Sequence, residues 1–210
     1  MRKYRVFFFF ALAACVCTGW AQKPDNPTKV IRRTTDAVLK TVTDPVLSAV
    51  GKKQERRAEM MRITNDVFDW PRMARSSMGR NWRKLDEKQR EEFIPAFKEL
   101  IMTAYLGHVE GYSGEKIEYK NERVEEGKFG EVTTVISTKE HGDIDIIYRM
   151  WLRDGEWRVR DVSVLGVSLV RNYRTQFSTL MRKGTFEEMM VKLRKKIEKQ
   201  RVEGTELKGK

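Results

Sequence analysis

Residues 156–177, with the sequence EWRVRDVSVLGVSLVRNYRTQF, decide the fold of this 210-residue chain. Apolar and polar residues alternate from Trp157 to Val164, which predicts a strand, and Gly166 then permits a tight turn. Ser168 stands immediately before an apolar pattern of helical spacing, so its side chain can cap the N-terminus of a helix. The stretch therefore predicts a sheet and a helix that are joined at one corner.

The alternation of period two continues upstream of this corner and predicts three further strands. The Asp154-Gly155 pair is typical of a tight hairpin between the last two of the four strands. The alternation slips by one residue within the fourth strand, so we expect a β-bulge near Arg160 and Asp161. The strands are indicated by Ile117 and Tyr119, by Val132, Thr134 and Ile136, by Ile144, Ile146, Tyr148, Met150 and Leu152, and by Trp157 and Val159.

Helical patterns occupy residues 26–107 and 168–202, on either side of a sheet region at 115–165. Asn26-Pro27 and Asp44-Pro45 each place a capping side chain before a proline, and the second pair predicts a short helix from Val46 to Val50. The predicted fold is therefore α+β, a curved antiparallel four-stranded meander packed with N- and C-terminal helices around an apolar cavity. We expect one domain over residues 22–203, in which the helical and sheet regions are intertwined subdomains, and a frayed tail at 204–210.

The clearest amphipathic helix follows Asp86 and Gln89, which have the spacing of a capping box. Pro95 falls inside this helix and predicts a kink whose unpaired backbone faces solvent. A second capping box, Thr185 with Glu188, predicts the last helix.

The first residues have the pattern of an export signal. A basic start is followed by an apolar run from Val6 to Val16, which is too short to span a bilayer comfortably, and cleavage is expected after Ala21. Leu12-Ala13-Ala14-Cys15 offers an alternative, because it matches the lipobox of bacterial lipoproteins and would leave a lipid anchor at Cys15. Both cysteines of the chain lie in this segment, so the mature protein is expected to contain no disulfide.

The chain carries a formal charge of +12, and removal of residues 1–21 takes away three positive charges and leaves +9. Such a charge suits nucleic acid, an anionic membrane surface or an anionic small ligand. Nucleic acid is disfavoured, because the aromatic residues lie on apolar faces and do not alternate with basic residues. The basic residues that cluster on the C-terminal helices suit a solvated face or an acidic partner: Arg182, Lys183, Lys192, Arg194, Lys195, Lys196, Lys199 and Arg201.

Gly166-Val167-Ser168 superficially resembles the nucleophile elbow of exported hydrolases. That motif requires a second glycine where Val170 stands, and a histidine after the serine, whereas His108 and His141 both precede it. The two histidines are also far apart, without the spacing of a metal site. We therefore expect no enzyme, no metal and no cofactor.

Three motifs give the chain its family resemblance. They are Phe68-Asp69 followed by Met73-Ala74-Arg75 and Gly79-Arg80-Asn81-Trp82-Arg83; Leu85-Asp86-x-x-Gln89-Arg90 with Phe93, Phe97 and Leu100; and Asp161-Val162 with Gly166-Val167-Ser168-Leu169-Val170 and Asn172-Tyr173-Arg174-x-Gln176-Phe177. A weaker one is Tyr112-x-Gly114-x-Lys116. From about Val30 to about Lys196, the chain resembles the MlaC, or toluene-tolerance, family of periplasmic phospholipid-binding proteins. Pro95 and the lipobox depart from the family pattern. A lipid anchor at the lipobox would prevent the mature protein from diffusing freely, so the sequence leaves open whether the protein is a soluble carrier.

The resemblance implies a nuclear-transport-factor-like sheet, a helical subdomain and a deep cavity for phospholipid acyl chains, without catalysis. It implies as partners an inner-membrane ABC transporter complex with a lipid-binding ring and an outer-membrane lipoprotein complex, and we expect a monomer. The alternation of apolar residues onto one side suggests which residues line the slot. They are Phe93, Phe97, Ile101, Tyr105, Val132, Ile136, Ile144, Ile146, Tyr148, Trp157, Leu169, Tyr173 and Phe177.

Two further expectations accompany this interpretation. Arg80, Arg83 and Arg174 are expected to hold the structure together through carboxylates rather than to bind a headgroup. The alternative function is a lipid-anchored adaptor of the same fold, in which the apolar residues form an ordinary core and no ligand is transported.

Overall fold

The computed structural model describes residues 25–49, 51–139 and 142–206; at 106–108, 110 and 203–206 only the backbone is described. The export signal, the lipobox and His141 lie outside these residues. Helices come first, in the order α1 (Pro27–Thr43), α2 (Lys53–Asn65), α3 (Trp70–Met78), the 3₁₀ helix η1 (Gly79–Lys84) and α4 (Glu87–Glu110). The strands β1 (Lys116–Glu125), β2 (Phe129–Thr138), β3 (Gly142–Arg153), β4 (Glu156–Val164) and β5 (Val167–Ser168) follow, and α5 (Leu169–Lys183) and α6 (Phe186–Glu206) end the described chain.

The five strands form one antiparallel sheet in the order β1-β2-β3-β4-β5, so the predicted α+β meander is confirmed and extended by one short strand. Asp154 and Gly155 both have positive φ, 51° and 80°, as a two-residue type I′ hairpin requires. Arg149 pairs with Asp161 and Met150 pairs with Val159, which leaves Arg160 as the extra residue of the predicted bulge. A second bulge, in β1 between Tyr119 and Asn121, had no signal in the sequence.

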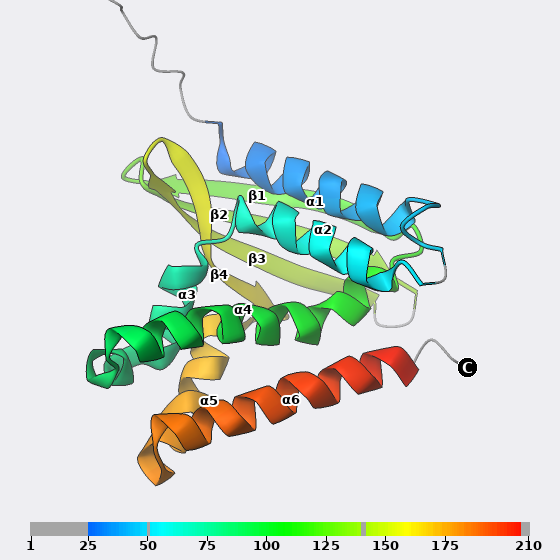
Figure 1. Ribbon diagram of the computed structural model, residues 1–210. Helices are drawn as coiled ribbons and strands as arrows, with labels where there is room; N and C mark the ends of the chain where they lie inside the picture. Colours follow the sequence, from blue (N-terminus) through cyan, green and yellow to red (C-terminus); the bar gives the residue numbers. More distant parts are fainter. Residues whose placement is uncertain (1–24, 50, 140–141, 207–210) are drawn as a thin grey trace, which may run out of the picture.

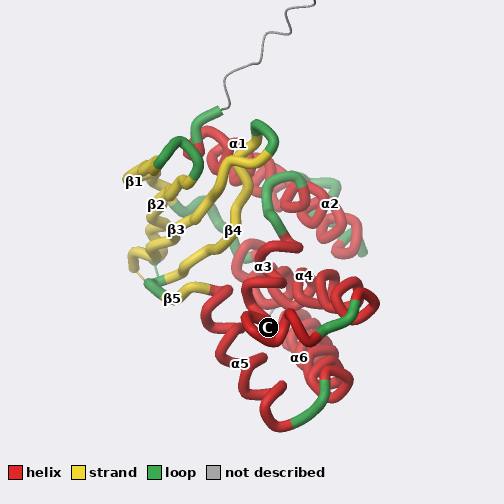
Figure 2. Tube along the Cα trace, turned by 90° about the vertical axis from the view of Figure 1, so that its left-hand side faces the viewer, coloured by secondary structure: helices red, strands yellow, loops and turns green. Residues whose placement is uncertain are grey.

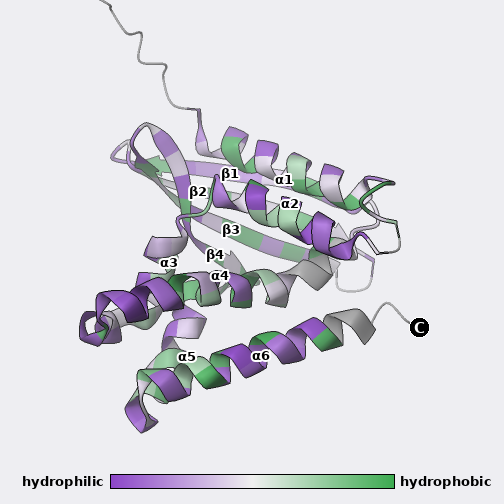
Figure 3. Ribbon diagram, in the orientation of Figure 1, coloured by the Kyte–Doolittle hydropathy of each residue, from purple (hydrophilic) through white to green (hydrophobic). Residues whose placement is uncertain are grey.

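Helices α1, α2 and α4 lie on one face of this sheet. Figure 1 shows α1 and α2 side by side in front of the strands, with α4 below them and α6 along α4. Figure 2 shows the strands at one side of the molecule and the helices at the other. Colouring by hydropathy places apolar residues on β3, on the strand surface behind α1 and α2 (Figure 3).

The helix starts follow the capping signals of the sequence. The Asn26 side chain accepts from the Lys29 N–H, and the Asp69 side chain accepts from the Arg72 N–H. Asp86 and Gln89 exchange side-chain to backbone hydrogen bonds, and so do Thr185 and Glu188, as capping boxes do. Local sequence therefore specifies where these helices begin.

Two helical predictions differ from the structure. The short helix expected at Val46–Val50 is a turn over the described residues 45–49, because the Asp44 carboxylate accepts the N–H groups of Val46 and Leu47 and holds a local turn. Helix α6 continues to Glu206, past the start of the expected frayed tail at 204. Pro95 lies inside α4 and is exposed, whereas the expected kink stays a prediction.

Candidate functional site

The predicted slot residues on α4 and α5 form a closely packed aromatic cluster. Phe93 and Phe97 are fully buried, and Tyr173 and Phe177 are at most 5% exposed. Ring centroids lie 5.2 Å apart for Phe93 and Phe177, 5.9 Å for Phe93 and Phe97, and 6.1 Å for Phe97 and Tyr173. The pairs that join α4 to α5, Phe93–Phe177 and Phe97–Tyr173, meet edge to face, and such contacts stabilise a core beyond the area that they bury. These rings therefore pack α4 against α5.

The predicted slot residues on the sheet share one face, but they differ in exposure. Val132 and Trp157 are buried, whereas Ile136, Ile144, Ile146 and Tyr148 are only half-buried. Register places these residues on the face that α1 and α2 cover, because Val132 pairs with Tyr148 and Ile136 pairs with Ile144. Apolar side chains that stay partly accessible beneath covering helices indicate that the helices do not close fully onto the sheet.

Tyrosines beside this face are held in their neutral form. Burial, followed by the neighbouring Tyr119, raises the pKa of Tyr148 to about 12. Burial, followed by the neighbouring Tyr105, raises the pKa of Tyr173 to about 12. Burial also raises the pKa values of Tyr105 and Tyr119. Desolvation disfavours the phenolate, so the environment around these rings favours uncharged groups.

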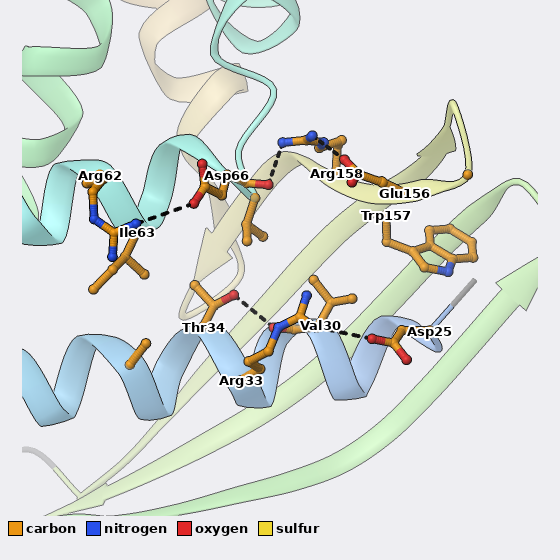
Figure 4. Close-up of a pocket in the computed structure, with 13 residues that line it drawn as sticks. Asp25, Val30, Arg33, Thr34, Arg62, Ile63, Asp66, Glu156, Trp157 and Arg158 are labelled. Atoms are coloured by element: carbon orange, nitrogen blue, oxygen red, sulfur yellow. Dashed lines mark hydrogen bonds and ion pairs between the residues drawn. The ribbon is translucent and has the colours of Figure 1, made fainter. Parts of the chain in front are cut away.

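A cavity of about 700 Å³ opens between α1, α2 and the β3–β4 hairpin. Figure 4 shows charged side chains from all three elements around it. Of the predicted slot residues only Trp157 lines this cavity, while the other lining residues were not expected from the sequence. They are Asp25, Val30, Arg33, Thr34, Ala37, Arg62, Ile63, Asp66, Val67, Gly155, Glu156 and Arg158.

The apolar members of this lining could have been found from the sequence. Val30 and Ala37 stand on the apolar face of α1, Ile63 is a buried residue of α2, and Val67 is a buried residue just after α2. Their pattern indicates burial, but helical periodicity does not tell whether a residue packs on protein or borders a cavity. The charged members gave no signal, because isolated arginines and carboxylates are common on any surface.

The comparisons with known proteins agree with this arrangement. A sequence model of the family described as "MlaC protein" matches residues 32–195, more than half of the chain. The chain belongs to the MlaC family. The predicted family resemblance is thereby confirmed.

Two curated relatives and one solved structure extend the family assignment. The intermembrane phospholipid transport system binding protein MlaC of Haemophilus influenzae is 22% identical over 200 residues, 92% of each chain. The toluene tolerance protein ttg2D of Pseudomonas putida is 24% identical over 156 residues, 70% of this chain and 73% of its own. The phospholipid-binding protein of Ralstonia solanacearum, solved with a phospholipid, has a TM-score of 0.76 at 21% identity and covers 84% of this chain and 99% of its own. This structural likeness shows that the fold is shared.

The most specific MlaC motif, around Gly166 and Ser168, has a structural role. Leu165 and Gly166 have φ of 49° and 79° and form a two-residue turn between β4 and β5. The Ser168 hydroxyl accepts from the Arg171 N–H and donates to a carboxylate oxygen of Asp161 at 2.7 Å. Ser168 is therefore confirmed as the cap of α5.

Asp161 is the residue of this motif whose role the sequence did not reveal. Its other carboxylate oxygen accepts the N–H of Val170 at 3.2 Å, and Arg149 lies 3.5 Å away across the strand pair. The carboxylate thus binds two donors at the start of α5, where an anion is also favoured by the helix dipole. The bulge at Arg160 is the irregularity that precedes Asp161 in β4.

Arg80 and Arg83 of the first MlaC motif and Arg174 of the third do not behave as expected. Arg174 donates to the backbone carbonyl of Ser76 at 2.7 Å, and its side chain lies against Gly79. Arg80 and Arg83 are exposed and make no ion pair with any carboxylate in the described part of the chain. The expectation of carboxylate partners is therefore wrong for all three. Arg174 instead supports the end of α3, where carbonyl groups lack helical partners.

Two further observations concern membrane-spanning helices and metal sites. No helix in the described ranges is long and apolar enough to cross a membrane. The described residues also contain no group of three histidine, cysteine or acidic side chains that could hold a metal ion. Asp143 and Asp145 of β3 are exposed.

Proposed function

We propose that this MlaC-family protein is a periplasmic phospholipid carrier. It holds acyl chains between the sheet and helices α1 and α2, and shuttles lipid between an inner-membrane ABC transporter complex with a lipid-binding ring and an outer-membrane lipoprotein complex. It works as a monomer, with phospholipid as its ligand, and requires no catalytic step. The names of the relatives and the phospholipid bound by the Ralstonia protein support this proposal.

The observation that carries the proposal is the half-buried apolar face of β3. Ile144, Ile146 and Tyr148 lie on the side of the sheet that helices cover, yet remain partly accessible. The covered face offers apolar contact from several neighbouring side chains, which suits an acyl chain. A methylene removed from water contributes about 0.8 kcal/mol, so two chains of ordinary length contribute on the order of 20 kcal/mol and must stay covered during transit.

We also propose that the residues predicted from the sequence lie in this slot. Ile136, Ile144, Ile146, Tyr148 and Trp157 border it from the sheet. The aromatic cluster of α4 and α5 forms the lower wall of the slot. Its rings mainly pack against one another, and we propose that only their sheet-facing sides contact the ligand.

The alternative function, an anchored adaptor with no transported ligand, differs in two measurable properties. Its interior would be empty of lipid, and Cys15 would carry acyl chains at the N-terminus of the mature protein. Native mass spectrometry of protein purified from a membrane-bearing host measures both the bound lipid and the acylation of Cys15 in one spectrum.

The decisive variant is Ile146→Asp. A carboxylate in the covered face would have to be desolvated beside acyl chains, so we expect loss of co-purified phospholipid with a normal circular dichroism spectrum. Ile147→Asp is the matched control, because the neighbouring side chain points to the opposite face of β3 and is also half-buried. Equal lipid content in wild type and Ile146→Asp would contradict the carrier proposal. Phe97→Asp is a poorer test, since Phe97 is fully buried in the aromatic cluster.

A further inference from the structure

Charged side chains surround the mouth of the cavity between α1, α2 and the β3–β4 hairpin. We call the six of them the rim; they are Asp25, Arg33, Arg62, Asp66, Glu156 and Arg158 (Figure 4). Behind the rim lie the apolar side chains of Val30, Ile63, Val67 and Trp157. The cavity is therefore amphipathic, with an apolar floor and a polar opening.

The rim carries equal numbers of positive and negative groups. It holds three arginines and three carboxylates, and the two ion-paired neighbours Lys29 and Glu59 add one charge of each sign. The chain as a whole has a formal charge of +12, so its positive excess lies elsewhere. A balanced rim on a strongly basic protein does not attract anions over distance as the remaining surface does.

The rim groups are accessible, and they take part in exposed ion pairs. Arg62 also donates two hydrogen bonds to the Glu59 carboxylate, at 2.9 and 2.6 Å, and Arg158 is bonded to Glu156. The side chains of Arg33, Arg62, Asp66 and Glu156 are 64–73% exposed. The Arg62 guanidinium lies 3.9 Å from Asp66, and the Arg33 guanidinium lies 3.3 Å from Asp25. Exposed pairs of this kind contribute little to stability, so a ligand can exchange with them at small cost.

We propose that the rim binds the headgroup of a zwitterionic phospholipid, an inference that rests on the carrier function proposed above. The phosphodiester accepts from the guanidinium groups of Arg33 and Arg62, which line the cavity from α1 and α2, because arginine forms paired hydrogen bonds with phosphate oxygens. The ammonium group of the headgroup pairs with the carboxylates of Asp66 and Glu156. The acyl chains then extend past Val30 and Trp157 towards the sheet.

Arg158 has a different task in this arrangement. Its guanidinium is already bonded to the Asp66 carbonyl and to the Glu156 carboxylate, and its side chain is only 30% exposed. It links the β3–β4 hairpin to the end of α2 and so positions the two carboxylates. An anionic headgroup such as phosphatidylglycerol lacks a cation for these carboxylates, and the rim therefore selects against it.

The test offers delipidated full-length protein to vesicles of equal parts phosphatidylethanolamine and phosphatidylglycerol, and measures the lipid that is extracted. Wild type is expected to extract phosphatidylethanolamine in about threefold excess, since two exposed ion pairs differ between the ligands. The double variant Asp66→Lys/Glu156→Lys is expected to reverse this preference. The double variant Arg33→Gln/Arg62→Gln is expected to take up less phosphatidylglycerol than wild type. Glu87→Lys/Glu91→Lys, a pair of exposed changes on α4 that raises the net charge by as much as Asp66→Lys/Glu156→Lys does, is the control for net charge.

The outcomes separate this inference from the carrier function. An unchanged headgroup ratio in both double variants, with normal total lipid, overturns the rim while the carrier function stands. A wild-type protein that takes up no lipid overturns both. A reversal that Glu87→Lys/Glu91→Lys produces equally is an effect of net charge and also overturns the rim. Glycerophosphoethanolamine, which has the headgroup without tails, is expected to compete only in the millimolar range, because the tails supply most of the binding free energy.

Discussion

Asp161 is the single residue that most directly connects the sheet to the C-terminal helices. Its carboxylate accepts from the Ser168 hydroxyl and the Val170 N–H, and it pairs with Arg149 of the adjacent strand. The side chain is 16% exposed, so these bonds form in a partly desolvated place where water replaces them poorly. One carboxylate thus fixes the strand register, the bulge and the start of α5 together.

Removal of this carboxylate is expected to lower the free energy of unfolding by about 2 kcal/mol in Asp161→Ala, since a helix cap and a charged hydrogen bond are lost. Urea unfolding followed by circular dichroism measures it. Asp145→Ala, at an exposed position on β3, is the control and is expected to change stability by less than about 0.5 kcal/mol. Equal stability of the two variants would show that the corner is held by packing alone.

Tyr148 and Tyr173 predict how stability depends on alkaline pH. Burial raises both pKa values to about 12, whereas an unfolded tyrosine ionises at about 10. Above pH 10 the unfolded state releases protons that the folded state keeps, so the free energy of unfolding falls between pH 10 and 12. The stabilisation that comes from the raised tyrosine pKa values is fully present below pH 10. Tyr148→Phe/Tyr173→Phe is expected to show a shallower decline than wild type in urea unfolding at pH 8 and 10.5; parallel declines would contradict the burial of these phenols.

At the scale of elements, the aromatic side chains of α4 and α5 are packed together, whereas apolar side chains of β3 are partly accessible. Phe93 and Phe97 are fully buried and contact Phe177 of α5. Ile136 and Ile144, at the far end of the covered sheet face, are half-buried. Apolar residues therefore pack against other protein side chains in α4 and α5, whereas on β3 apolar residues stay partly accessible.

Truncation separates these two roles. In lipid-free protein Phe93→Ala is expected to cost about 3–5 kcal/mol of unfolding free energy, because it leaves a cavity in a packed core. Ile144→Ala is expected to cost about 1 kcal/mol or less, since the side chain already borders space. Denaturant unfolding gives both values. A large loss for Ile144→Ala would mean that the sheet face is packed in solution and that no slot exists there.

Sequence reasoning predicted the elements of this fold better than it predicted the site. Alternation, the Asp154-Gly155 hairpin and the phase slip at Arg160 are local signals, and each specified its piece of the sheet. For the aromatic residues of α4 and α5, helical periodicity predicts burial, but it does not tell whether protein or a ligand covers the side chain. The cavity of α1, α2 and the hairpin joins residues 25–37 to 155–158, and such distant contacts have no local signal.

At the scale of the whole molecule, the chain divides into a packed base and a cover. The base comprises α3–α6 and the aromatic cluster, whereas the cover comprises α1 and α2, which lie over the sheet (Figure 1). Apart from its pairing with α1, α2 is held through a small buried cluster of Val42 and Met60 and by bonds such as that from Lys98 to Asn65. Val30 and Ile31 join α1 to the main core, whereas α2 has few buried apolar contacts, and elements with few such contacts open at low free energy. Lipid is therefore expected to leave by movement of the cover, with the base unchanged.

Hydrogen exchange tests this division directly. A ligand that binds only the closed state suppresses opening in proportion to its occupancy, so delipidation is expected to raise amide exchange in residues 27–43 and 53–65 by about tenfold or more. Residues 169–197, which belong to the base, are expected to exchange at the same rate with and without lipid, and they serve as an internal reference. Mass spectrometry of peptic peptides from the two forms resolves these segments. An increase that is equal in the cover and the base would mean that lipid stabilises the whole molecule globally, and release would then require unfolding beyond α1 and α2.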